Sequence, residues 1–167
     1  SALAGGGLVT FNCGPAPHTL LISSRKTIAE NTEIRGGGLI TISGGNAISH
    51  FQVFNGKSLL LRDLTLSGGR GPGGAIENFG ALQLTAVTLT DNTATTTGGA
   101  IQNYGTVSIE KSLISGNLAP QSGGGIHNDT GQVSLCFMPL VFSAPAHQEE
   151  AALVAHAGAG NDAIPIR

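Results

Sequence analysis

Short runs of alternating apolar and polar residues recur along most of the chain, with the two-residue period of half-buried strands. They are clearest in three successive segments, at residues 73–97, 98–122 and 123–142. In each segment one burst follows a Gly-Gly pair and two more follow a short polar turn. No helical period appears in these segments. The pattern predicts an all-β fold made of short strands.

The three segments are also copies of one another. They open with GGAIENFG, GGAIQNYG and GGGIHN, and the first two span 25 residues each, while the third has one extra residue at Asp129-Thr130. Ile76, Ile101 and Ile126 therefore fall into one column. A repeat of this kind predicts one winding of a parallel β-solenoid, whose windings stack at about 4.8 Å.

The pattern continues upstream with looser spacing. Leu59 and Leu61 precede Leu82 and Leu84 by 23 residues, and earlier apolar bursts lie near Val9, Leu20, Ile34 and Ile40. We predict a right-handed parallel β-helix of about six or seven windings over residues 1–142. Residues 143–167 would form a short helical or irregular cap, because a bare solenoid end exposes strand edges. The alternative is that this tail binds a second copy or another partner.

Asparagines recur at the predicted corners. Asn78, Asn103 and Asn128 align, as do Asn92 and Asn117. Asn tolerates tight corners, and its amide can bond to the Asn one winding away. We expect structural ladders; a ligand groove is the alternative.

The quoted repeat openings, together with SGNLA at residues 115–119, resemble repeats of bacterial cell-surface proteins with a right-handed parallel β-helix. These include polymorphic outer-membrane-protein repeats and the wider pectate-lyase-like superfamily. The resemblance covers roughly residues 2–142 and implies a secreted or cell-surface location. It implies no single activity, since the superfamily holds lyases, hydrolases and adhesins.

The composition of the chain excludes several classes of binding partner. Only 11% of residues are charged and the formal net charge is -2, which argues against nucleic acid. The chain contains no run of 18 consecutive apolar residues, so no membrane-spanning helix is predicted. The five histidines lack metal-ligand spacing, so we predict no metal and no cofactor. Arg25-Lys26 is a lone basic pair that we expect to face solvent.

The two cysteines are predicted to remain free thiols. Cys13 lies in an early winding and Cys136 in the last full one. About five windings at 4.8 Å separate them by roughly 24 Å, far beyond disulfide reach.

We predict no catalytic residues. A glycosidase needs two carboxylates roughly 5 to 10 Å apart, and a calcium-assisted lyase needs several around the ion. No two acids share an aligned column in the regular repeats. The column of Arg62, Thr85 and Glu110 mixes charges.

One patch is a candidate for sugar binding. Tyr104, together with Phe79, would supply a flat apolar platform, and polar partners would come from Glu77, Gln102, His127 and Asp129. The alternative is that these are solvated surface residues beside a turn.

A flat hydroxyl array that orders water is not expected. A Thr-x-Thr row appears only at Thr88-Leu89-Thr90, and the next repeat has Leu113-Ile114-Ser115.

The function most consistent with these features is a non-catalytic exported surface or interaction module, adhesin-like, whose partner is a glycan or a cell-surface protein. The alternatives are a carbohydrate-active enzyme of the pectate-lyase-like kind and a structural fragment of a larger surface protein.

Overall fold

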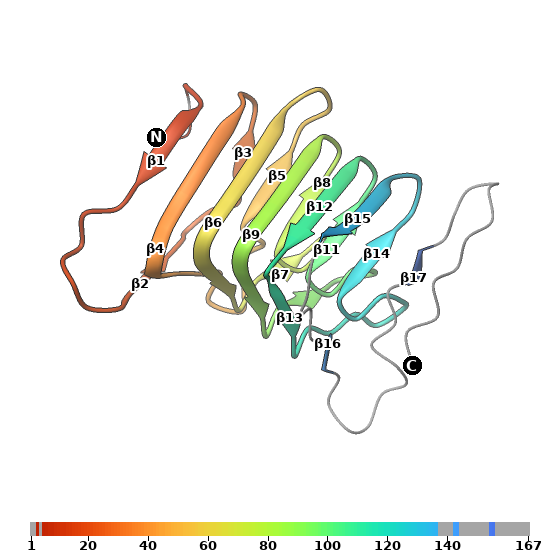
Figure 1. Ribbon diagram of the computed structural model, residues 1–167. Coiled ribbons are helices and arrows are strands. Elements are labelled where there is room, and N and C mark those ends of the chain that lie inside the picture. The colour runs from red at the N-terminus through yellow and green to blue at the C-terminus, as the bar shows by residue number, and fades with distance from the viewer. Residues whose placement is uncertain (1–2, 4, 137–141, 144–153, 156–167) are drawn as a thin grey trace.

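The computed structural model describes residues 3, 5–136, 142–143 and 154–155. All regular structure in these residues is strand, and every strand pair is parallel. The strands stack into a β-solenoid with β1 (Gly7–Thr10) near one end of the stack and β15 (Gln132–Cys136) near the other (Figure 1). The predicted parallel β-helix is confirmed.

Each winding passes through two sheets. The long sheet has the order β1-β4-β6-β9-β12-β15, with β2, β13 and β16 beside it, and the short sheet has the order β17-β14-β11-β8-β5-β3. The long-sheet strands are β1 (Gly7–Thr10), β2 (His18–Leu21), β4 (Thr32–Ser43), β6 (Ser58–Ser67), β9 (Ala81–Thr90), β12 (Thr106–Glu110), β13 (Leu113–Ser115), β15 (Gln132–Cys136) and β16 (Phe142–Ser143). The short-sheet strands are β3 (Lys26–Ile28), β5 (Phe51–Val53), β8 (Ile76–Asn78), β11 (Ile101–Asn103), β14 (Ile126–Asn128) and β17 (Val154–Ala155), and β7 (Arg70–Gly71) pairs with β10 (Thr93–Ala94) between the sheets. The described residues make about five windings.

The pairing follows the sequence repeat. Ile101 pairs with Ile76 on one side and with Ile126 on the other, so the predicted isoleucine column is confirmed. Leu59 pairs with Leu82, at the predicted offset of 23. The inward side chains of these strands are almost fully buried and form one continuous aliphatic core. This core explains why a chain with so few aromatic residues folds.

A left-handed corner bends each long strand. Asp63, Ala86 and Lys111 have φ values of 51°, 53° and 49°, so these aligned residues turn the backbone. The corresponding corner of β4 is longer and contains Gly36–Gly38, where the register shifts between Arg35 and Ile40. The long sheet is therefore divided into two faces, one before and one after the corner.

The Gly-Gly pairs are required by the close approach of neighbouring windings. A Cβ atom on Gly74 would collide with the carbonyl oxygen of Gly99, and Gly74 has a φ of 47°. Gly99 in turn lies against the carbonyl oxygen of Gly124. No other residue fits this position without separating the windings.

The predicted asparagine ladder at the short sheet is confirmed. Asn78 Nδ2 donates to Asn103 Oδ1 over 2.7 Å, and Asn103 Nδ2 donates to Asn128 Oδ1 over 2.6 Å. Asn103 also accepts a bond from the Gly105 N–H and donates to the Gly105 carbonyl. These amides are buried, and they provide hydrogen-bond partners for the backbone N–H and carbonyl groups at each corner.

A second ladder follows the long sheet and ends on a histidine. Asn117 Nδ2 donates to the Leu89 carbonyl, and Asn92 Nδ2 donates to the Leu66 carbonyl. Ile42 is the next residue of that column, and its carbonyl lies 2.9 Å from His50 Nε2. His50 therefore makes the contact with the column carbonyl that an asparagine makes in the other windings, although it does not align with these asparagines in the sequence. Its Nδ1 has no hydrogen-bond partner.

The cysteines lie far apart. Cys13 is exposed and free. The register places Thr10 and Cys136 at opposite ends of one column that crosses six strands. Because Cys13 follows Thr10 by only three residues, a bond between the two cysteines is excluded.

Little of the tail falls within the described residues. Val154–Ala155 form the two-residue strand β17, paired with His127 and Asn128, in the segment for which a helical or irregular cap was expected. This pairing covers part of an open strand edge. The rest of the predicted cap lies outside the described residues.

Replacing Asn103 with Ala is expected to destabilise the fold by about 3 kcal/mol. The substitution leaves Asn128 Oδ1 and the Gly105 N–H without partners and removes one of the three acceptors of Asn78 Nδ2. The free energy of unfolding in urea measures the loss. Asn55→Ala, in an exposed turn, should change stability by less than about 0.5 kcal/mol. Equal effects of the two substitutions would contradict a structural role for the ladder.

Acid is expected to destabilise the protein through His50. Burial lowers the pKa of this histidine from 6.5 to about 4, against the opposing effect of its bond to the Ile42 carbonyl. The unfolded chain therefore binds a proton that the folded chain does not, and stability falls as pH decreases from 6.5 to 4. The full loss is about 3 kcal/mol. Unfolding free energies measured across this range should show the slope, and His50→Asn should reduce it. His18→Gln, an exposed control, should leave it unchanged.

Candidate functional site

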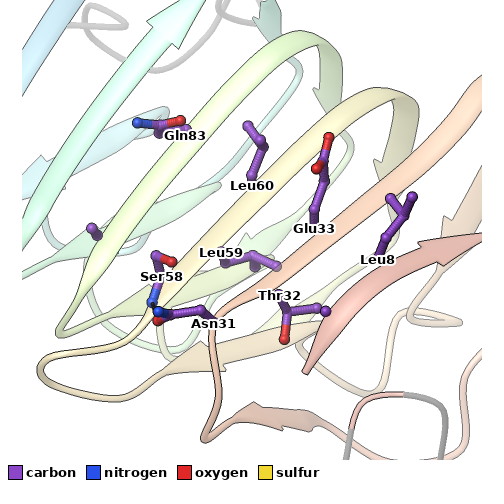
Figure 2. Close-up of a pocket in the computed structure, with 10 residues that line it drawn as sticks. Leu8, Asn31, Thr32, Glu33, Ser58, Leu59, Leu60 and Gln83 are labelled. Atoms are coloured by element: carbon purple, nitrogen blue, oxygen red, sulfur yellow. Dashed lines mark hydrogen bonds between the residues drawn. The ribbon is translucent and has the colours of Figure 1, made fainter. Parts of the chain in front are cut away.

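An open hollow lies on the outer face of the long sheet, before the corner that divides it. We call it the sheet hollow; it has a volume of about 370 Å³. Its floor is one column, in which Leu8, Glu33, Leu60 and Gln83 pair across β1, β4, β6 and β9. Figure 2 shows these four side chains side by side on successive strands. Further lining residues are Gly7, Asn31, Thr32, Ser58, Leu59 and Ala81.

Strand periodicity explains why these side chains point outward. Ile34, Leu59 and Leu61 are buried in the core, so their neighbours Glu33 and Leu60 must lie on the opposite face. Leu8 is 56% exposed although it is apolar. The hollow therefore offers two leucine side chains beside one carboxylate and one amide.

Glu33 is held by two guanidinium groups. Its Oε1 lies 2.6 Å from Arg35 Nε and 3.2 Å from Arg62 Nε. The hydrogen bond from Arg35 lowers the pKa of the Glu33 carboxyl; burial opposes this effect, and the charges of Arg35 and Arg62 add to the lowering. A carboxyl group with a lowered pKa is ionised at neutral pH and cannot serve there as a general acid.

Glu33 is the only carboxylate among the residues that line the hollow. Acid–base hydrolysis of a glycosidic bond needs a second carboxyl group on the other side of that bond. Across residues 3, 5–136, 142–143 and 154–155, no group of three or more His, Cys, Asp or Glu side chains is placed to hold a metal ion. In those same residues no helix is long and apolar enough to cross a membrane. The hollow has features of a binding site and lacks a hydrolytic pair.

Three of the sequence-predicted patch residues are brought into one column on the short sheet. Glu77, Gln102 and His127 pair across β8, β11 and β14 (Figure 1). Each of them also has a partner inside the protein. Gln102 is 5% exposed and bonds to Thr97, and His127 Nδ1 lies 3.1 Å from Ser122 Oγ.

Glu77 belongs to a polar network that the sequence did not reveal. Its Oε2 accepts bonds of 2.9 Å from both Arg25 and Gln52, and Arg25 also bonds to Gln52. Arg25 was expected to face solvent; its side chain is 33% exposed and also reaches the Glu77 carboxylate on the short sheet, a contact that was not expected. The network occupies Glu77, one of the groups that were expected to bind a ligand.

Tyr104 and Asp129 lie in the turn that follows this column. The Tyr104 ring stacks on Phe79, with centroids 4.8 Å apart and planes 4° from parallel. One face of each ring is therefore covered by the other ring. Asp129 is exposed, and its backbone N–H donates to the Asn103 carbonyl. The predicted patch thus consists of a half-buried polar column and a separate aromatic stack.

The sheet hollow was missed because it lies in the irregular windings upstream of the clear repeats. The signal was present: the offset of 23 that aligns Leu59 with Leu82 also aligns Leu60 with Gln83. Glu33 was hidden by the longer corner at Gly36–Gly38, which interrupts the sequence alignment between β4 and β6.

Comparison of the chain with protein-family models, with curated proteins and with solved structures found no match.

The Arg25–Glu77 ion pair is expected to contribute about 1 kcal/mol, because both side chains are partly buried. A double-mutant cycle with Arg25→Met and Glu77→Gln measures the coupling energy in urea unfolding. The same cycle on Lys57 and Glu30, whose side chains are 35% and 55% exposed, is the control and should give less than about 0.5 kcal/mol. A coupling energy no larger than that of the control pair would contradict the network.

Proposed function

We propose that this protein is a non-catalytic, exported interaction module that binds a glycan through the sheet hollow. The observation that carries the proposal is the combination of Leu8 and Leu60 with the polar groups of Glu33 and Gln83 on one column. A sugar ring has apolar C–H faces and hydroxyl edges. It needs both kinds of contact at once, and this column places the exposed Leu8 and the half-buried Leu60 beside a carboxylate and an amide group.

The chemistry of the hollow favours hydrogen bonding over bond cleavage. The ionised Glu33 carboxylate is an acceptor for sugar hydroxyls, and the Gln83 amide both donates and accepts. Arg35 and Arg62 hold Glu33 in a fixed position, which lowers the entropic cost of binding. The rigid sheet beneath keeps the column in place. Binding of this kind requires no cofactor.

The repeat motifs support an exported location. Their resemblance is to polymorphic outer-membrane-protein repeats and to the pectate-lyase-like superfamily, so we place the chain with adhesin-like proteins of the cell surface. The lowered pKa of Glu33 and the lack of a second carboxylate in the hollow favour an adhesin over a glycan-cleaving relative. The alternative site for a glycan or a cell-surface protein is the stack of Phe79 and Tyr104 with the exposed Asp129; the neighbouring Glu77, Gln102 and His127 are already bonded within the protein and favour it less.

The test is a screen of the purified protein against immobilised plant, fungal and bacterial glycans. For a glycan that binds, Leu60→Glu should raise the dissociation constant at least about tenfold, which corresponds to a loss of about 1.4 kcal/mol in binding free energy. The substitution places a second negative charge next to Glu33 and removes an apolar contact. Ser108→Glu is the matched control, because Ser108 lies in the same column, adjacent to Gln83 and outside the hollow. It should change the dissociation constant less than about twofold, well under 1 kcal/mol.

Three outcomes would contradict the proposal. Binding that is lost in Tyr104→Ala and His127→Ala but kept in Leu60→Glu would move the site to the short sheet. A screen without binding, unaffected by any of these substitutions, would favour a structural spacer within a larger surface protein. Calcium-dependent release of unsaturated sugars, or any other robust turnover, would make the protein an enzyme.

A further inference from the structure

The outer face of the long sheet after the corner carries hydroxyl groups in two parallel files. Thr19, Thr41, Thr65 and Thr88 pair across β2, β4, β6 and β9. Ser43, Ser67, Thr90 and Ser115 form the second file, two residues further along the strands, across β4, β6, β9 and β13. We call these eight residues the hydroxyl face. The expectation that the array is confined to Thr88 and Thr90 is wrong, because the structure aligns Thr-x-Ser rows of β4 and β6 with it.

The array is regular in two dimensions. The register runs without a shift from β4 to β9 over this part of the sheet, since the irregularity in β4 lies before Ile40. Neighbouring strands lie about 4.8 Å apart, and alternate residues of a parallel strand about 6.6 Å apart. The hydroxyl groups therefore repeat on a nearly rectangular grid. The grid ends at Leu21 in one file and at Leu113 in the other.

The hydroxyl groups of the Thr file are not used within the protein. In the part of the chain that the structure describes, Thr41, Thr65 and Thr88 make no side-chain hydrogen bond. In the second file, Thr90 donates to Asp91 and Ser43 accepts from the Gly45 N–H. The unpartnered hydroxyls must therefore bond to water or to a ligand.

The face also differs in chemistry from the rest of the sheet. None of its eight residues is charged, whereas Glu33, Arg35 and Arg62 lie on the other side of the corner. None carries an aromatic ring that could stack on a sugar. Threonine has a restricted χ1 angle, so its hydroxyl and methyl groups keep fixed directions on a sheet. Five of the eight residues are threonines and Ser43, Ser67 and Ser115 are serines, so the first file carries methyl groups beside its hydroxyl groups and the second is mostly hydroxyl alone. A neutral grid of hydroxyl groups suits a partner that is itself a neutral lattice of hydrogen-bonding groups.

We propose that the hydroxyl face orders a layer of water and adsorbs to the surface of ice. The repeat across the strands is close to an oxygen spacing of hexagonal ice and the repeat along the strands is somewhat shorter than the second lattice spacing, so waters bound to successive threonines of the file would lie near lattice positions. The waters are arranged before contact, which lowers the entropic cost of joining the crystal. This activity is independent of glycan binding in the sheet hollow, because the two sites occupy opposite sides of the corner.

The experiment measures ice directly. Purified protein is added to a sucrose solution that is frozen to fine crystals and annealed just below melting, and mean crystal size is followed by microscopy. A second measurement gives the fraction of protein that is incorporated into a slowly growing ice body. The native chain should restrain crystal growth and enter the ice several-fold more than an equal mass of serum albumin.

A matched pair of variants on one strand locates the activity. Thr88→Tyr inserts a bulky ring in the grid, and Thr85→Tyr places the same ring on β9 before the corner; both threonines are half-buried. We expect Thr88→Tyr to reduce incorporation into ice several-fold and Thr85→Tyr to leave it unchanged. Thr65→Ser keeps the hydroxyl group and should retain most of the activity, while Thr65→Val should lose it. Circular dichroism confirms that each variant keeps its strand content.

The proposal is overturned if the native protein behaves like albumin in both assays, or if Thr85→Tyr and Thr88→Tyr have equal effects. Binding to microcrystalline cellulose that Thr88→Tyr abolishes, without any effect on ice, would assign the face to a polysaccharide instead. Loss of ice binding would leave the glycan result for Leu60→Glu unaffected, so each proposal fails independently.

Discussion

In-register backbone pairing between successive windings is the interaction on which every other feature of this protein depends. A single winding has too few residues to enclose a core, so its aliphatic side chains are buried only when the next winding lies directly above it. The pairing of Ile76, Ile101 and Ile126 shows this arrangement in its simplest form. Because the pairing is parallel and in register, like residues gather into columns, and each column acquires a chemistry of its own.

Buried amides make the register specific. An aliphatic core alone would tolerate small slips, since leucine, isoleucine and valine are nearly interchangeable in it. Asn78, Asn103 and Asn128 would lose several hydrogen bonds in a slipped alignment, and their polar groups would stay buried without partners. His50 extends the same principle to the winding in which Gly69 stands at the position of Asn92, because its Nε2 reaches the carbonyl oxygen that an asparagine reaches in the neighbouring windings.

The outer columns show how the same scaffold separates different surface chemistries. Before the corner of the long sheet, Leu60 and Glu33 border an open hollow in which the carboxylate is held ionised by arginines. After the corner, threonines and serines form an uncharged grid. On the short sheet, Glu77 is already bonded to Arg25 and Gln52, so that column stabilises the fold and has little left to offer a ligand. The residues with a left-handed backbone conformation at the corner, such as Ala86, separate the surface before the corner from the surface after it.

The sequence by itself determined the solenoid, its 25-residue winding, the asparagine ladder and the separation of the cysteines, because each of these follows from local periodicity and a constant offset between repeats. It did not determine the columns of the upstream windings, where the insertion at Gly36–Gly38 changes the offset and hides the alignment of Glu33 with Leu60 and of Thr41 with Thr65. It also did not determine which polar side chains are already bonded within the protein. Arg25 reaches Glu77 across 52 residues of sequence, and Phe79 stacks on Tyr104 one winding away. Such contacts depend on the direction of side chains after stacking, and only the tertiary structure decides that direction.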